Sequence, residues 1–248
     1  LLSLLRNLPT VAPHLRLNAL SKRKEWKGKE LRDDHFVEIN ELIAQAIGIT
    51  FDVGLTRVCT LKVAAETEYH PVRTYLRAAK RNWDGVSRIQ YILGDWLGVP
   101  ANPLYQRILR NWFISCVARA MEPGCKVDTA LVFTGVEGLK KSTLFSIMGG
   151  EWFGDTKMDI NNKDAYLQLH SHWIYEWSEL NAVHRNRTPE DVKAFLSSAR
   201  DSFRAPYDAS VQSHPRSNVF VGTSNHGEFL TSKTGNRRFW VIPVRKDI

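Results

Sequence analysis

Apolar residues recur at helical spacing through the first half of the chain. One apolar face runs from Phe36 to Ala46, and Gly48 can end this helix. Similar faces predict further helices over about 72–79, 89–98 and 103–121. The N-terminal half of the chain is therefore expected to be largely helical.

The pattern changes after Lys126, where short apolar runs bounded by turns alternate with helical segments. The runs are Ala130–Phe133, Trp173–Tyr175, Val219–Val221 and Phe239–Ile242. This alternation is typical of a parallel sheet wrapped by helices. The mixed charges of residues 22–33 predict a solvated linker. We therefore expect a helical N-terminal region over residues 1–125, partly linker-like in 1–32, followed by an α/β core over 126–248.

Composition narrows the class of protein. Hydrophobic residues make up 43% and charged residues 24%, which is the balance of a soluble globular domain. No apolar run approaches the roughly 18 residues that cross a bilayer, so no membrane partner is expected. The three cysteines lack C-x-x-C spacing, which favours the reducing cytoplasm over a disulfide or zinc framework.

The net charge is +8, and its distribution is uneven. Residues 184–248 contain 11 Lys and Arg against 6 Asp and Glu, a net +5. A basic excess of this kind favours a polyanionic partner such as DNA.

A candidate phosphate-binding loop follows the first apolar run. A strand, a Gly-containing turn and then Lys-Ser-Thr opening a helix form the context that a P-loop requires. The start of a helix offers unpaired N–H groups and a positive dipole end to phosphate oxygens. Lys141 would reach the β and γ phosphates of ATP, and the Ser142 hydroxyl would hold Mg²⁺. The predicted nucleotide-binding residues are Gly135, Val136, Glu137, Gly138, Leu139, Lys140, Lys141, Ser142 and Thr143.

One position departs from the usual P-loop pattern. Gly normally precedes the Lys, and Lys140 stands there instead. A left-handed backbone at this position costs a non-Gly residue about 1–2 kcal/mol. A single charge-assisted phosphate contact supplies about 1.5–3 kcal/mol. Nucleotide binding is therefore expected to survive, while the effect on affinity and turnover stays open.

Polar residues follow two later apolar runs. Glu176 directly follows Trp173–Tyr175 and is the candidate acid beside Mg²⁺, and Glu179 is the candidate for polarising the attacking water. The two roles can be exchanged. Asn225 follows the next run and can contact the γ phosphate or the water, although a turn also explains an Asn there.

Two arginines precede the last apolar run. Arg237 or Arg238 could place a planar guanidinium on the transferring phosphate of a neighbouring subunit. Solvated arginines or a contact with the DNA backbone are the alternatives.

Basic and aromatic residues alternate between the acids and Asn225. Arg200, Arg204 and Arg216 could follow a phosphate backbone, with Phe203 or Tyr207 stacking on bases. The same residues could equally support the ATP site of a neighbouring subunit.

Several of these segments together resemble the virulence-associated protein E family, in unbroken order from about residue 70 to the end. The matching segments are Trp83–Gly85 with Arg88, Glu122–Lys126, Gly135–Thr143, Gly150–Phe153, Lys163–Ala165, Trp173–Leu180, Arg204–Tyr207 and Thr234–Trp240.

The resemblance implies a P-loop NTPase core of the AAA+ or superfamily 3 helicase kind, found in phages and genomic islands of bacterial hosts. It implies ATP- and Mg²⁺-dependent DNA unwinding in replication by a homo-oligomeric ring, such as a hexamer, often beside a primase. A non-hydrolysing P-loop scaffold or replication initiator that binds DNA is the main alternative. A small-molecule kinase is disfavoured by the basic C-terminal half and the paired arginines.

Overall fold

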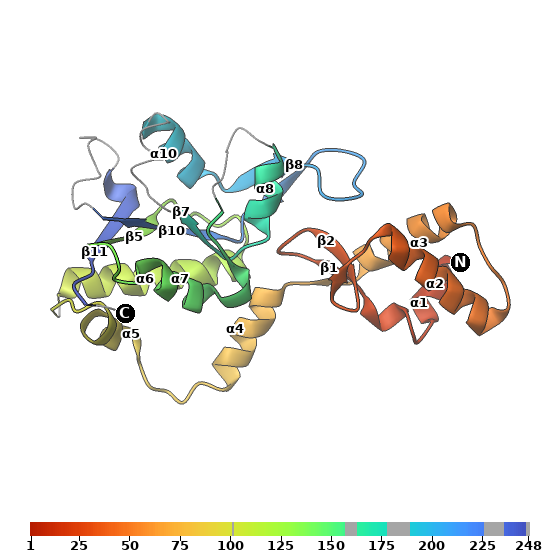
Figure 1. Ribbon diagram of the computed structural model, residues 1–248, viewed down its shortest axis with the longest axis horizontal. Coiled ribbons are helices and arrows are strands. Elements are labelled where there is room, and N and C mark those ends of the chain that lie inside the picture. The colour runs from red at the N-terminus through yellow and green to blue at the C-terminus, as the bar shows by residue number, and fades with distance from the viewer. Residues whose placement is uncertain (101, 157–162, 178–188, 226–235, 247–248) are drawn as a thin grey trace. The chain divides into compact units, whose positions relative to one another are not determined.

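The computed structural model describes residues 1–100, 102–156, 163–177, 189–225 and 236–246. It has a mixed α/β fold (Figure 1). Among the described helices, none combines the length and apolarity that crossing a membrane requires.

The chain forms two compact units. Unit 1 comprises Leu1–Pro71 and Arg204–Gln212, and unit 2 comprises Val72–Phe203 and Ser213–Ile248. The boundary expected near residue 125 therefore lies inside unit 2. The physical reason is that α6 (Pro103–Met121) packs on the strands of the α/β core, with Trp112 against Phe145.

Unit 1 combines three helices with a four-stranded sheet. The sheet was not expected, because the sequence predicted a helical N-terminal region. The strands have the order β3-β2-β1-β4, and β4 pairs with β1 in parallel. Their bounds are Leu15–Asn18 (β1), Arg23–Trp26 (β2), Lys29–Glu30 (β3) and Glu68–Tyr69 (β4). The helices are Leu2–Asn7 (α1), Asp33–Ile47 (α2) and Val53–Glu66 (α3), with a 3₁₀ turn at Ala12–His14. As predicted, Gly48 ends α2 in a left-handed conformation.

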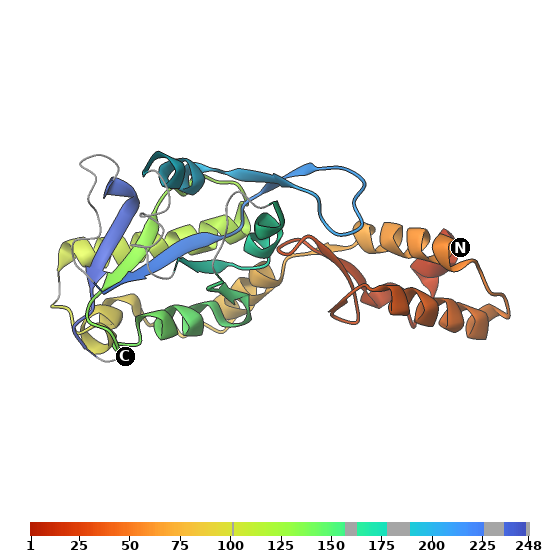
Figure 2. The same cartoon turned by 45° about the horizontal axis from the view of Figure 1, so that its top comes forward.

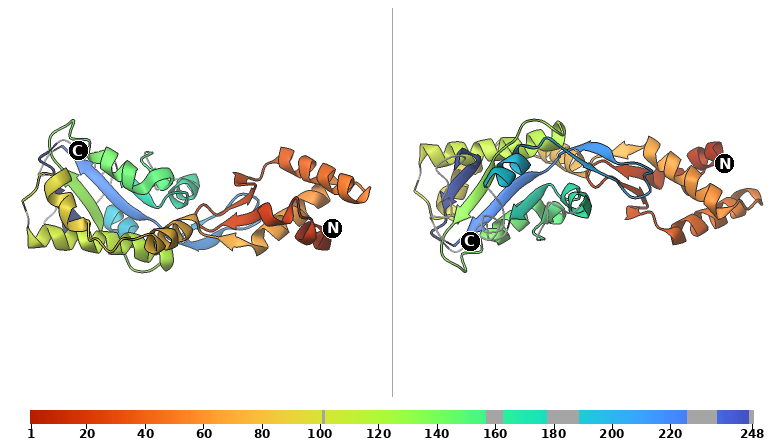
Figure 3. Two further views of the ribbon diagram at one scale, coloured as in Figure 1. Left: turned by 90° about the horizontal axis from the view of Figure 1, so that it is seen from below. Right: turned by 90° about the horizontal axis from the view of Figure 1, so that it is seen from above.

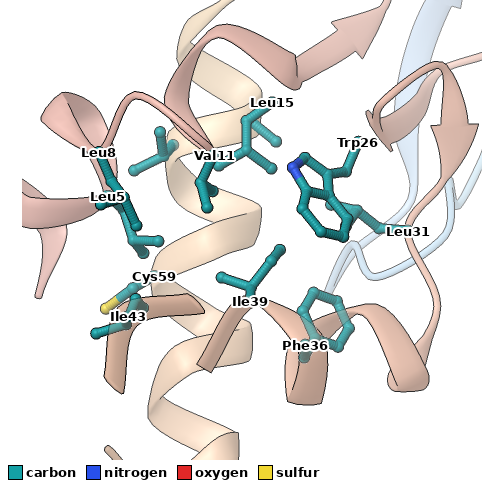
Figure 4. Packing of buried hydrophobic residues seen from close by; sticks show 12 residues of the cluster. Leu5, Leu8, Val11, Leu15, Trp26, Leu31, Phe36, Ile39, Ile43 and Cys59 are labelled. Atoms are coloured by element: carbon teal, nitrogen blue, oxygen red, sulfur yellow. The ribbon is translucent and has the colours of Figure 1, made fainter. Parts of the chain in front are cut away.

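The linker predicted over residues 22–33 is wrong. β2 and β3 form a hairpin there, and the Trp26 side chain is 2% exposed. Trp26 packs in an apolar cluster with Leu15, Leu31, Phe36 and Ile39 (Figure 4). Charge alternation suggested solvent on both faces of this segment, but one large aromatic side chain is enough to anchor a two-stranded ribbon to a core.

Unit 2 is built around a five-stranded parallel sheet of order β11-β5-β10-β7-β6, which confirms the predicted parallel sheet. The strands are Ala130–Thr134 (β5), Phe153–Gly154 (β6), Ile174–Trp177 (β7), Val219–Ser224 (β10) and Phe239–Pro243 (β11). A separate hairpin pairs Arg200–Phe203 (β8) with Gln212–Pro215 (β9). In both views of Figure 3, β5 in green and β10 in blue run side by side.

Helices cover both faces of this sheet (Figures 1 and 2). On one face, Phe133 of β5 stacks on Phe145 of α7 (Lys141–Gly149), with ring centroids 4.4 Å apart. On the other face, Trp177 and Phe220 pack on Phe195 of α10 (Pro189–Ser197). Side chains alternate between the faces of a strand, so these buried strands read as continuous apolar runs in the sequence.

Two of the remaining helices of unit 2 begin at or next to predicted positions, those over 71–81 and 89–91, while the helix over 163–170 was not predicted. The three helices are Pro71–Arg81 (α4), Ile89–Tyr91 (α5) and Lys163–His170 (α8), with a π-helical turn at Ile92–Trp96 and 3₁₀ turns at Gly150–Trp152 (η3) and Asn236–Arg238 (η4). The predicted helix over 89–98 is thus one short α turn followed by a π turn.

The hairpin of unit 1 generates a prediction about stability. Trp26→Ala removes a buried aromatic side chain and is expected to cost about 3–5 kcal/mol of the free energy of unfolding of unit 1. Lys29→Ala, an exposed residue paired with Trp26 across the same hairpin, is the control and should change it by less than about 0.5 kcal/mol. Denaturant unfolding followed by near-UV circular dichroism measures both. If Trp26→Ala were as stable as the wild type, residues 22–33 would behave as a solvated linker and the buried hairpin would be contradicted.

Candidate functional site

The predicted phosphate loop begins at the carboxyl edge of the parallel sheet. Thr134, the last residue of β5, pairs with Ser224 of β10 and with Pro243 of β11. The Gly135 N–H then donates to the Ser224 carbonyl at 3.2 Å. The loop therefore leaves β5 between the tips of two neighbouring strands, and α7 starts at Lys141.

The backbone geometry of the loop is restrictive at two positions, Gly135 and Lys140. A Cβ on Gly135 would lie 2.6 Å from the Val244 carbonyl oxygen, so a side chain cannot fit there without moving the backbone. Lys140 adopts the left-handed conformation whose steric cost was weighed above, with φ 51° and ψ 31°. It therefore carries the steric cost expected for a residue with a Cβ.

The Lys141 side chain folds back over the loop. Its ammonium donates to the carbonyls of Gly135 at 2.9 Å and Val136 at 2.7 Å, and to Asn225 Oδ1 at 3.2 Å. The residue is only 7% exposed. The hydrogen-bond partners of this buried cation are neutral oxygens, which compensate its charge only in part.

A carboxylate lies beside the first turn of α7. The Ser142 hydroxyl donates to Glu176 Oε1 at 2.7 Å, and the Thr223 hydroxyl donates to the same oxygen at 2.9 Å. The other oxygen, Glu176 Oε2, is buried and has no hydrogen-bond partner among the described residues. Hydroxyl and carboxylate oxygens are ligands that Mg²⁺ accepts, so Ser142 and Glu176 fit this metal.

The family model of the virulence-associated protein E-like domain matches residues 76–248. That range contains the whole site. This chain belongs to the virulence-associated protein E-like family. A search of curated proteins finds no match.

The chain is also similar in fold to solved structures of the NrS-1 C-terminal region (residues 305–718) in apo form. One has a TM-score of 0.55 at 13% identity and covers 94% of this chain and 59% of that one. Another has a TM-score of 0.51 at 15% identity and covers 85% and 53%. This member of the virulence-associated protein E-like family thus spans between half and two thirds of the length of those structures.

Burial dominates the electrostatics of the site in this family member. It raises the pKa of Glu176, against the lowering effect of the hydrogen bonds from Ser142 and Thr223. It also lowers the pKa of Lys141, partly offset by the negative charge of Glu137. Both shifts mean that the charged forms of these two groups lack the solvation they have in water.

The structure brings together most, but not all, of the predicted site residues. Lys141, Ser142, Glu176 and Asn225 meet at the carboxyl edge of the sheet. Glu179 lies outside the described residues. Thr223 belongs to the site and was missed, although its position two residues before Asn225 puts both side chains on one face of the strand end.

Arg237 and Arg238 lie at the opposite edge of the sheet. Both belong to η4, which precedes β11, and β11 is parallel to β5. A five-residue strand is about 16 Å long, so that length separates them from the loop of their own chain. Arg238 donates instead to the Ser197 hydroxyl at 3.1 Å.

The prediction that Arg216 contacts DNA is wrong for this structure. Arg216 is 0% exposed, and its guanidinium donates to both carboxylate oxygens of Asp201 at 2.7 Å. It also lies over the Phe195 ring, 4.3 Å from its centroid. Burial alone would raise the pKa of Asp201, but hydrogen bonds from His170 and Arg216 lower it overall. Arg216 is therefore one half of a buried ion pair at the base of the β8–β9 hairpin.

The other predicted DNA contacts lie on or near that hairpin. The Arg200 guanidinium donates to the Ser213 hydroxyl and carbonyl across it, and the exposed Arg204 follows β8. The Tyr207 hydroxyl donates to the Leu31 carbonyl within unit 1, and Phe203 is buried. A DNA role for Arg200, Arg204 and Tyr207 stays a prediction.

The raised pKa of Glu176 predicts a pH dependence of stability. Above its ordinary value of 4.5, the carboxyl ionises in the unfolded chain before it does so in the folded one. Ionisation in the unfolded chain favours unfolding. Without metal, the wild-type protein should therefore lose stability relative to Glu176→Gln as the pH rises above about 4.5. Melting temperatures over a pH series measure this, with the exposed Glu151→Gln as control. If the melting temperatures of wild type and Glu176→Gln changed with pH in parallel, the raised pKa of the buried Glu176 carboxyl would be contradicted.

The left-handed Lys140 generates a second prediction. Lys140→Gly should relieve about 1–2 kcal/mol of backbone strain and lose about 0.5–1 kcal/mol to chain entropy. A net gain between about 0 and 1.5 kcal/mol in the free energy of unfolding is expected. Lys140→Ala removes the side chain but keeps the strain, so it should show no such gain. A gain in both variants would trace the effect to the side chain instead of the backbone.

Proposed function

We propose that this chain is a P-loop ATPase domain that binds ATP and Mg²⁺ and acts on DNA. The observation that carries the proposal is the Lys141 ammonium, which is buried on two loop carbonyls and Asn225 beside the Ser142–Glu176 pair. A lysine and a hydroxyl at the start of α7, a carboxylate of β7 and an amide that follows β10 form a set of groups suited to phosphoryl transfer.

Each residue would have a separate task. The three donors of Lys141 would leave the carbonyls for oxygens of the β and γ phosphates. The first turn of α7 would supply backbone N–H groups and a favourable dipole to the same phosphates. Asn225 would hold the γ phosphate or the attacking water in position. Glu179 remains our proposal for polarising that water.

Ser142 and Glu176 would hold Mg²⁺. The unpartnered Glu176 Oε2 supports this assignment, because a buried carboxylate oxygen without a donor is costly unless a cation compensates it. Bound Mg²⁺ neutralises charge that develops on the β and γ phosphate oxygens. The Thr223 hydroxyl would keep the carboxylate oriented while Ser142 turns toward the metal.

We also propose that the protein assembles into a ring, with a hexamer as the expected form. Arg237 and Arg238 support this, since their place at the opposite edge of the sheet suits a phosphate on another subunit better than one on their own. A guanidinium supplied in trans couples hydrolysis to assembly.

The biological setting is inferred from relatives and from charge. The family, the resemblance to superfamily 3 helicases and the net charge of +8 support DNA unwinding in the replication of a phage or mobile genetic element. A primase is an expected partner, and the cytoplasm of a bacterial host is the expected location. The NrS-1 structures support the fold only.

One observation favours a second candidate, a non-hydrolysing P-loop scaffold or replication initiator. The strained Lys140 replaces the usual Gly and can weaken the loop. DNA binding that is indifferent to ATP, together with no turnover, would identify this alternative.

The proposal predicts that Lys141→Ala abolishes ATP hydrolysis, because its buried ammonium is the group proposed to neutralise the transferring phosphate. A fall in turnover of at least about 100-fold is expected, in line with the loss of a principal electrostatic contact. Phosphate release with and without single-stranded DNA, at a stated salt concentration, measures it.

Lys126→Ala, an exposed lysine outside the loop, is the matched control and should hydrolyse ATP like the wild type. Unchanged turnover in Lys141→Ala would remove the mechanism.

A further inference from the structure

A basic helix and an exposed aromatic turn adjoin each other in unit 2. Residues 71–88 contain five Arg and Lys and one Asp, a net +4 out of +8 for the whole chain. They form α4 and the turn that follows it. None of the tasks proposed above for the ATP site uses them.

The basic residues of α4 lie apart from its apolar face. Val72 is buried and the Tyr75 ring packs near Trp152, with centroids 5.5 Å apart, so this side of the helix is attached to unit 2. Arg77, Lys80 and Arg81 are exposed and make no ion pair within the described part of the chain. The helix thus presents three uncompensated positive charges to solvent.

The turn after α4 is ordered by its own contacts. The two terminal guanidinium nitrogens of Arg88 donate to the carboxylate of Asp84, which also accepts the Val86 N–H at 3.0 Å. The Trp83 indole N–H donates to the Val86 carbonyl at 3.1 Å. Gly85 supplies the left-handed position that the turn requires, with φ 82°.

These contacts hold a large aromatic ring in water. Trp83 is 62% exposed although its one polar atom already has a partner. An indole that needs no further hydrogen bond offers only its flat surface to a ligand. Soluble proteins expose few Trp side chains beyond those that their function needs. An exposed indole held in an ordered turn is suited to stacking on another flat ring.

We propose that Arg77, Lys80, Arg81 and Trp83 form a binding surface for single-stranded nucleic acid, separate from the ATP site. Exposed cations attract the phosphate backbone, and an exposed ring stacks on unpaired bases without regard to sequence. The Cα atoms of Arg81 and Trp83 are at most about 7 Å apart, so phosphate and base contacts can fall on the same or adjacent nucleotides. The proposal rests on the proposed DNA partner but not on hydrolysis.

Fluorescence anisotropy of the full chain with labelled oligo(dT) of about 16 nucleotides, without nucleotide present, tests the surface. Trp83→Ala is expected to weaken binding about ten-fold, and Trp83→Phe to restore most of it, because a phenyl ring still stacks. Tyr91→Ala removes a neighbouring aromatic side chain of similar exposure and should bind like the wild type. The loss in Trp83→Ala should be smaller on duplex DNA, where bases are already stacked.

The charges are tested separately. The triple variant Arg77→Glu, Lys80→Glu, Arg81→Glu should lower the salt dependence of log Kd by about 2, the value for three single-strand phosphate contacts. Arg107→Glu with Arg110→Glu, two exposed arginines on α6, is the control. All variants alter exposed residues, so unchanged melting temperatures and unchanged basal ATP turnover are expected.

Wild-type affinity in Trp83→Ala, or an equal loss in the Tyr91 or α6 controls, would overturn this surface while leaving the proposed function standing. Unchanged oligonucleotide binding with a change in oligomer mass would make it a contact between copies of the chain instead. No binding by the wild type would overturn both the surface and the proposed DNA partner.

Discussion

The parallel register of β5, β10 and β7 is the constraint on which the candidate site depends. Because all three strands point the same way, their carboxyl ends meet at one edge of the sheet. Lys141 and Asn225 are 84 residues apart in the chain and Ser142 and Glu176 are 34 apart, yet each pair is in hydrogen-bond contact. Reversing any one of these strands would send its polar tip to the far edge. The same geometry explains why the paired arginines before β11 cannot join the site of their own chain.

The buried Asp201–Arg216 pair shows a second kind of constraint. Removing two charges from water costs several kcal/mol per ion, which their attraction only partly offsets. Such a pair contributes little net stability, but two parallel hydrogen bonds allow only one relative placement of their carriers. Here the carriers are β8 and the segment after β9, so the ion pair fixes the base of the hairpin.

Much of unit 2 could be predicted from the sequence, because strands buried on both faces are continuously apolar and the loop lies between a strand and a helix. The sequence did not allow us to predict which charged side chains are buried or which partners they have. Arg200 and Arg216 look alike in the chain, yet one is exposed and the other is wholly buried. The hairpin of residues 22–33 was missed because nine of the twelve residues in this segment are charged, and only Trp26 and Leu31 show where the core lies. The boundary expected near residue 125 falls inside unit 2, since a change from helical to strand pattern marks a change of element and not the end of a core.

The route of the chain has a practical consequence for dissecting the molecule. It leaves unit 2 after Phe203, contributes nine residues to unit 1, and returns at Ser213. Within unit 1, this excursion supplies the Asp208 partner of Lys24 and the Tyr207 ring beneath Arg57. No single cleavage of the polypeptide can therefore separate the two units intact. A fragment ending at Pro71 would lack part of its own surface, and expressing unit 1 alone calls for a short spliced segment that replaces the missing loop.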